Sequence, residues 1–190
     1  MICFVKYWEF MTNEKQQIME ISAITRNEFL MLLESYEQKM KLPRSQENEE
    51  IIREAEIQFC TAIYLRCATD IELFAIMFFS HYCRYEFNAF HRATFSDYVY
   101  GERAIRRASC APRGFAKSTL EALIKPIHDV CYKLEKFIVI ISNTEAQAVQ
   151  KLKDIQTEFI TNDFLIRVYG RFIHGRKAGS TDFVASNSEH

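Results

Sequence analysis

The residues best suited to chemistry lie in segment 111–118, which reads A-P-R-G-F-A-K-S. This segment follows the phosphate-binding pattern G-x-x-x-x-G-K-[ST], with alanine at both positions where the pattern has glycine. In such a loop the backbone N–H groups surround the β- and γ-phosphates of a nucleotide, the lysine neutralises their charge and the hydroxyl ligates Mg²⁺. Lys117 and Ser118 occupy the last two positions of the pattern, so the segment predicts a site for a nucleoside triphosphate and Mg²⁺.

The two alanines are the departure from this pattern. Glycine at these positions allows a positive φ and a close approach of the backbone to phosphate, whereas a Cβ adds steric demand. Ala111 and Ala116 therefore predict weaker binding, while Gly114 keeps some freedom in the loop. The alternative interpretation is an ordinary turn from a strand to a helix that carries a surface lysine.

A phosphate-binding loop must lie between a strand and a helix, and the flanking residues predict both. Residues 104–110 read as a short strand and residues 117–134 as a helix. Residues 137–141, F-I-V-I-I, form a continuous apolar run typical of a central strand that is covered on both faces. A helix to about residue 161 and a possible strand at 181–186 follow. This order predicts an α/β domain with a parallel sheet.

The first hundred residues read as helical. Thr25 and Glu28 have the spacing of a capping box at the start of the first of these helices. We therefore expect a helical lead-in region over residues 1–100 and a nucleotide-binding part over residues 101–190. The helices are expected over residues 27–40, 46–67, 70–79 and 87–100.

Composition and charge exclude several classes of protein. The chain is 48% hydrophobic, with 5 Gly and 3 Pro, so it is neither disordered nor fibrous. Residues 61–190 carry 17 basic and 14 acidic side chains, an excess too small to predict nucleic-acid binding by itself. The 6 cysteines form no C-x-x-C pair and read as reduced thiols rather than zinc ligands. No apolar run approaches the roughly 20 residues of a membrane span, and no signal peptide is recognised.

The run A-P-R-G-F-A-K-S-T-L at residues 111–120 resembles the A-P-R-G-x-[GA]-K-S-T segment of the large terminase subunit of tailed bacteriophages, the ATP-driven motor that packages viral DNA. The likeness extends to Phe90-His91, to residues 126–128 and to residues 137–148, and covers roughly residues 70–190. Alanine before the lysine is tolerated in this family. The resemblance implies a helical amino-terminal region followed by an incomplete P-loop NTPase (RecA-like) parallel sheet with flanking helices.

The resemblance also implies roles for individual residues. Lys117 would be the phosphate-binding lysine, Ser118 the Mg²⁺-ligating hydroxyl and Arg113 the catalytic arginine that senses or stabilises the γ-phosphate. For Arg113, a salt bridge to a nearby carboxylate or a contact with a DNA phosphate is an equally open alternative. The implied cofactors are ATP and Mg²⁺. The residues of the implied ATP-binding loop are Ala111, Pro112, Arg113, Gly114, Phe115, Ala116, Lys117, Ser118 and Thr119.

The same resemblance implies the partners and the place of action. These partners are double-stranded DNA, the phage portal protein and the small terminase subunit, with a ring oligomer for the full-length protein. The expected location is the host cytoplasm during virion assembly, without secretion or membrane association.

One required element is missing from the sequence. An ATPase of this type holds Mg²⁺ through an acidic residue at the end of an apolar strand, and a neighbouring glutamate activates water. No run of four apolar residues followed by Asp-Asp or Asp-Glu occurs here. The resemblance implies that these carboxylates and a nuclease domain lie beyond His190, so we expect this portion to bind ATP weakly and to hydrolyse it poorly. The alternatives are another P-loop NTPase, such as a helicase-like protein, and a non-catalytic interaction fragment.

Overall fold

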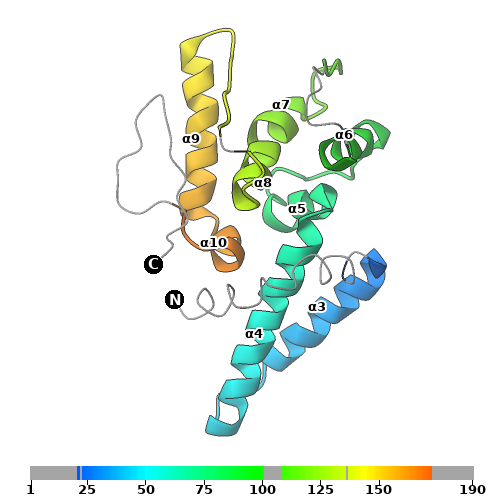
Figure 1. The fold of residues 1–190 in the computed structure, drawn as a ribbon, viewed down its shortest axis with the longest axis vertical. Helices are drawn as coiled ribbons and strands as arrows, with labels where there is room; N and C mark the ends of the chain where they lie inside the picture. Colours follow the sequence, from blue (N-terminus) through cyan, green and yellow to red (C-terminus); the bar gives the residue numbers. More distant parts are fainter. Residues whose placement is uncertain (1–20, 22, 101–107, 136, 173–190) are drawn as a thin grey trace. The chain divides into compact units, whose positions relative to one another are not determined.

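The computed structural model describes residue 21 and residues 23–100, 108–135 and 137–172. The chain divides into two compact units, Met1–Thr69 and Asp70–His190. Helices account for all the regular structure in the described residues (Figure 1). The functional division expected between residues 100 and 101 stays a prediction.

The first unit is built on two packed helices, α3 (Arg26–Met40) and α4 (Gln46–Cys67) (Figure 1). The expected capping box starts α3: the Glu28 backbone N–H donates to Thr25 Oγ1 at 3.2 Å, and the Thr25 N–H donates to Glu28 Oε2 at 2.7 Å. Arg66, near the end of α4, donates from one guanidinium nitrogen to the carbonyls of Ile21 and Ile24, at 2.9 and 3.0 Å. These bonds tie the segment before α3 to the end of α4.

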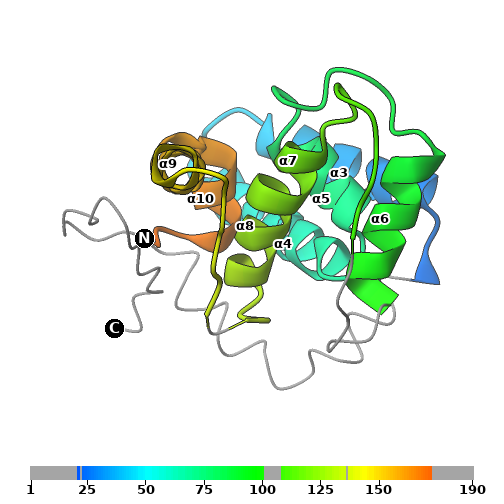
Figure 2. The same ribbon diagram turned by 90° about the horizontal axis from the view of Figure 1, so that it is seen from above.

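The second unit contains α5 (Ile71–Phe78), α6 (Ala89–Tyr100), α9 (Glu145–Thr161) and α10 (Asp163–Tyr169). Between α6 and α9, one continuous helical segment consists of α7 (Lys117–Thr119), η2 (Leu120–Ile124) and α8 (Lys125–Cys131). Figure 2 shows α9 end-on, and α9 contacts this segment at η2. The turn η2 is a π-helix, a form that is rare and often found at functional sites.

Aromatic side chains form the centre of this second unit. Phe74 of α5 is fully buried, and its ring lies 5.0 Å from the His128 ring in an edge-on arrangement. The Phe74 ring also lies 6.0 Å from the Tyr169 ring. The hydroxyls of Tyr132 and Tyr169 are 2.6 Å apart and hydrogen-bonded, which joins the end of α8 to the end of α10. The segment 126–128, which carried part of the resemblance, therefore belongs to the core.

The predicted helices are confirmed in position, with ends that shift by one or two residues: α5 is Ile71–Phe78 and α6 begins at Ala89. Helix α10 was not predicted. The helix that starts at Lys117 differs most at its end. That helix ends at Cys131 instead of residue 134. Lys133 adopts a left-handed conformation, with φ of 52°. The Lys133 N–H bonds to the Val130 carbonyl at 3.2 Å and the Leu134 N–H to the Asp129 carbonyl at 2.9 Å. This pair of bonds is the Schellman motif, which satisfies the last carbonyls of a helix.

The predicted α/β class, with its incomplete RecA-like parallel sheet, is wrong for the described part of the chain. That part contains helices and no strand. Residues 108–110 and 137–141 are not in strands, and the remaining strand positions expected at 104–107 and 181–186 lie outside the described residues. Phe137 and Ile141 are 83% and 87% exposed. The apolar run predicted a buried strand because β-branched residues favour one, but a strand also needs backbone partners on a neighbouring segment, and no described segment supplies them.

Candidate phosphate-binding loop

The loop at residues 111–116 leads directly into the helical segment that begins at Lys117. Gly114 has φ of 88° and Ala116 has φ of 49°, so two loop residues are left-handed. A Cβ at Gly114 would meet nothing within 4 Å, so backbone conformation and not space favours glycine there. Ala116 occupies a pattern glycine position and adopts the left-handed conformation that glycine favours, at a cost of about 1–2 kcal/mol. At Ala111, the other pattern position, φ is not positive, so alanine costs nothing in backbone strain.

Lys117 reaches back across this loop. Its ammonium group donates a hydrogen bond to the carbonyl of Ala111, at the opposite end of the loop, and its side chain is half-buried. The Leu120 N–H donates to the Ala116 carbonyl at 2.9 Å, which closes the first turn of the helical segment. Lys117, the residue that the pattern assigns to phosphate binding, therefore spans the loop.

The other predicted site residues lie around the same loop. Ser118, Pro112 and Arg113 are exposed, and Thr119 is half-buried. Within the described part of the chain, Arg113 makes no ion pair. The structure thus brings all nine predicted residues into one loop and one helix start, and it leaves Ser118 and Arg113 exposed.

Helix α6 supports the loop from the side. The ring of Phe115 lies 6.0 Å from the ring of Phe90, at an interplanar angle of 77°. His91 Nε2 lies 3.1 Å from the carbonyl oxygen of Phe115 and is hydrogen-bonded to it. Phe90 and His91 carry part of the resemblance, but their contact with the loop does not follow from the sequence, because 24 residues separate His91 from Phe115.

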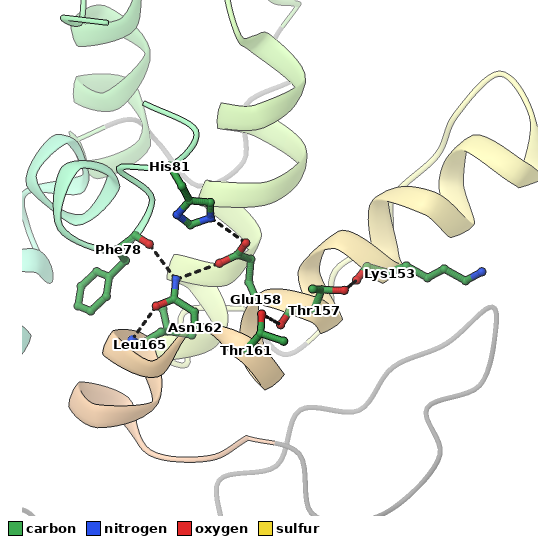
Figure 3. Close-up of polar contacts among 8 residues, drawn as sticks. All are labelled: Phe78, His81, Lys153, Thr157, Glu158, Thr161, Asn162 and Leu165. Atoms are coloured by element: carbon green, nitrogen blue, oxygen red, sulfur yellow. Dashed lines mark hydrogen bonds and ion pairs between the residues drawn. The ribbon is translucent and has the colours of Figure 1, made fainter. Parts of the chain in front are cut away.

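A second polar cluster joins α5 to the junction of α9 and α10 (Figure 3). Glu158 is 5% exposed, and its Oε1 lies 3.0 Å from His81 Nε2. Its Oε2 accepts a hydrogen bond from Asn162 Nδ2 at 2.9 Å, and the same nitrogen donates to the carbonyl of Phe78 at 2.8 Å. Both carboxylate oxygens are therefore engaged, which suits a structural connection better than a reactive carboxylate.

Burial raises the pKa of two residues that follow α5, and the Glu158 charge contributes at one of them. The pKa of Tyr82 is raised from its ordinary value, first by burial and then by the negative charge of Glu158. The pKa of Cys83 is raised by burial, so its thiol resists ionisation. Among the described residues, no group of three or more His, Cys, Asp or Glu side chains is placed to hold a metal ion.

No helix in the described ranges is both long enough and apolar enough to cross a membrane. Comparison with known proteins found no family model, no curated protein and no solved structure that matches this chain.

Proposed function

We propose that residues 111–119 bind the phosphate groups of ATP together with Mg²⁺, and that this chain is the amino-terminal part of a large terminase subunit. The observation that supports the nucleotide site most strongly is the position of Lys117, which extends from the helix start across the loop to Ala111. Left-handed Ala116 adds to this support, since the pattern places glycine at that position. The terminase assignment rests on the sequence resemblance.

Lys117, Ser118 and Arg113 have distinct roles in this proposal. Lys117 exchanges its bond with the neutral Ala111 carbonyl for contacts with the β- and γ-phosphates, where both partners are charged. The exposed Ser118 hydroxyl ligates Mg²⁺, which would neutralise phosphate charge when bound. Arg113 is exposed and extends to the γ-phosphate, where its guanidinium stabilises negative charge.

The larger assembly in this proposal is a packaging motor. Its partners are double-stranded DNA, the portal protein and the small terminase subunit, and the full-length protein forms a ring in the host cytoplasm. These partners come from the resemblance of residues 111–120 and the segments around it to the terminase family.

The nucleotide site is tested by titrating fluorescent ATP, ADP and AMP into the chain with Mg²⁺ or with EDTA. We expect affinity to fall in the order ATP, ADP, AMP, because the loop contacts the outer phosphates. EDTA should weaken ATP binding to the wild type and have little further effect on Ser118→Ala. Equal affinity for ATP and AMP, or no saturable binding by the folded chain, would overturn the proposal.

A further inference from the structure

His91 lies in the first turn of α6 and forms a reciprocal pair with Asn88, the residue before this helix. The His91 N–H donates to Asn88 Oδ1 at 3.2 Å, and the Asn88 N–H donates to His91 Nδ1 at 3.1 Å. This is the geometry of a capping box, with an imidazole in the place usually taken by Glu or Gln. The backbone of the helix start therefore fixes the ring of His91.

The bond from the Asn88 N–H also determines which ring nitrogen of neutral His91 carries the hydrogen. A backbone N–H can only donate, so His91 Nδ1 must be the acceptor and carry no hydrogen. In the neutral ring the hydrogen then sits on Nε2, which donates to the Phe115 carbonyl at 3.1 Å. One imidazole thus connects the start of α6 to the loop in a fixed direction.

The bond to the Phe115 carbonyl orients the next amide. In a trans peptide the C=O and the following N–H point in opposite directions, and none of the described peptide bonds is cis. Holding the Phe115 carbonyl toward α6 therefore directs the N–H of Ala116 away from α6. That N–H has no hydrogen-bond acceptor among the described residues. Ala116 immediately precedes Lys117, where the pattern expects amides that face phosphate.

We propose that His91 is a positioning residue for the phosphate-binding loop: it holds the Phe115–Ala116 peptide so that the Ala116 N–H is available to a nucleotide phosphate. This inference rests on the proposed function. Contacts of the Phe115 ring with Phe90 and His91, at centroid distances of 6.0 and 6.2 Å, hold the same residue from a second direction. His91 does not contact the nucleotide in this arrangement.

Three variants separate positioning of the loop from capping of the helix. His91→Leu removes both ring bonds but keeps bulk, and His91→Gln supplies an acceptor for the Asn88 N–H and a donor for the Phe115 carbonyl. Asn88→Ala is the matched control, because it removes the side-chain cap and leaves the Asn88 N–H and the His91–Phe115 bond in place. All three are compared with the wild type and Lys117→Ala by circular dichroism, Mg²⁺-ATP titration and hydrogen exchange of residues 113–118.

We expect His91→Leu to bind ATP about five-fold more weakly, the effect of one net hydrogen bond, and to exchange the loop amides faster. His91→Gln should restore affinity to within about two-fold, and Asn88→Ala should keep it while losing thermal stability. Wild-type affinity in His91→Leu, with binding abolished in Lys117→Ala, would overturn the role of His91 and leave the proposed function intact. A folded wild type that binds no ATP would overturn both.

Discussion

Asn162 is the residue whose replacement should most disturb the second unit, because one amide makes three hydrogen bonds between helices. Its Nδ2 donates to the Phe78 carbonyl at 2.8 Å and to Glu158 Oε2 at 2.9 Å, and its Oδ1 accepts from the Leu165 N–H at 3.0 Å (Figure 3). The last bond caps α10, and the first two tie α9 to the end of α5. We therefore predict that Asn162→Ala destabilises this unit.

The magnitude follows from these bonds. Loss of the α10 cap costs about 1 kcal/mol. Loss of the bond to the buried Glu158 carboxylate costs about 1.5–3 kcal/mol, and loss of the bond to the Phe78 carbonyl about 1 kcal/mol. Because neighbouring bonds are not additive, we expect a total near 3 kcal/mol, or a melting temperature lower by roughly 6–12 °C.

The assay is urea unfolding followed by circular dichroism, with Asn162→Ser as the matched control. Serine caps a helix about as well as asparagine but is too short to reach Phe78 and Glu158, so Asn162→Ser should lose about 2 kcal/mol. The order of stability should be wild type, Asn162→Ser, Asn162→Ala. A loss below about 1 kcal/mol in Asn162→Ala, or no loss in Asn162→Ser, would refute the reasoning.

Three further perturbations address other features. The pKa of Glu28 is lowered by its bonds to the backbone and hydroxyl of Thr25, so charged Glu28 stabilises α3 above the unfolded pKa, and this contribution is lost as pH falls through the folded pKa. Glu28→Gln should remove this pH dependence of the unfolding free energy, measured by urea unfolding at pH 3–6. The same pH profile in the wild type and in Glu28→Gln would contradict this role. Burial raises the pKa of the Cys83 thiol, so iodoacetamide at about pH 8 should modify exposed Cys110 before Cys83. Mass spectrometry gives the order, and modification of Cys83 before Cys110 would be inconsistent with this burial. Val139 and Ile141 are 61% and 87% exposed, so replacing both with lysine should reduce light scattering from self-association without lowering the melting temperature. A clear drop in melting temperature would show that these side chains are buried.

Most helices of the described residues could be predicted because their signals are local, whereas α10 was not predicted. Thr25 and Glu28 are three residues apart and form the expected capping box. The expected strand at residues 137–141 could not be predicted reliably from local signals. Residues 137–141 have the composition of a buried strand, but strand formation depends on a partner elsewhere, and the described part of the chain provides none.

In the candidate site, too, the local features could be predicted from the sequence and the contacts between distant residues could not. Residues 111–119 are contiguous, so their pattern predicts one loop, and the structure brings them together. The contact of His91 with Phe115 joins residues 24 apart, and that of His81 with Glu158 joins residues 77 apart, so neither follows from spacing. One local signal was available for His91: Asn88 precedes it by three residues, the spacing of a capping box in which histidine replaces Glu.

The most direct test of the nucleotide site is calorimetric titration of Mg²⁺-ATP into the wild type, Lys117→Ala and Lys153→Ala. The Lys153→Ala control removes the same charge from an exposed position on α9 (Figure 3). Because a charge-assisted bond to phosphate contributes about 1.5–3 kcal/mol, Lys117→Ala should bind roughly ten- to a hundred-fold more weakly, and Lys153→Ala should bind as the wild type does. Equal binding by the wild type and a folded Lys117→Ala would contradict the phosphate-binding role of this loop.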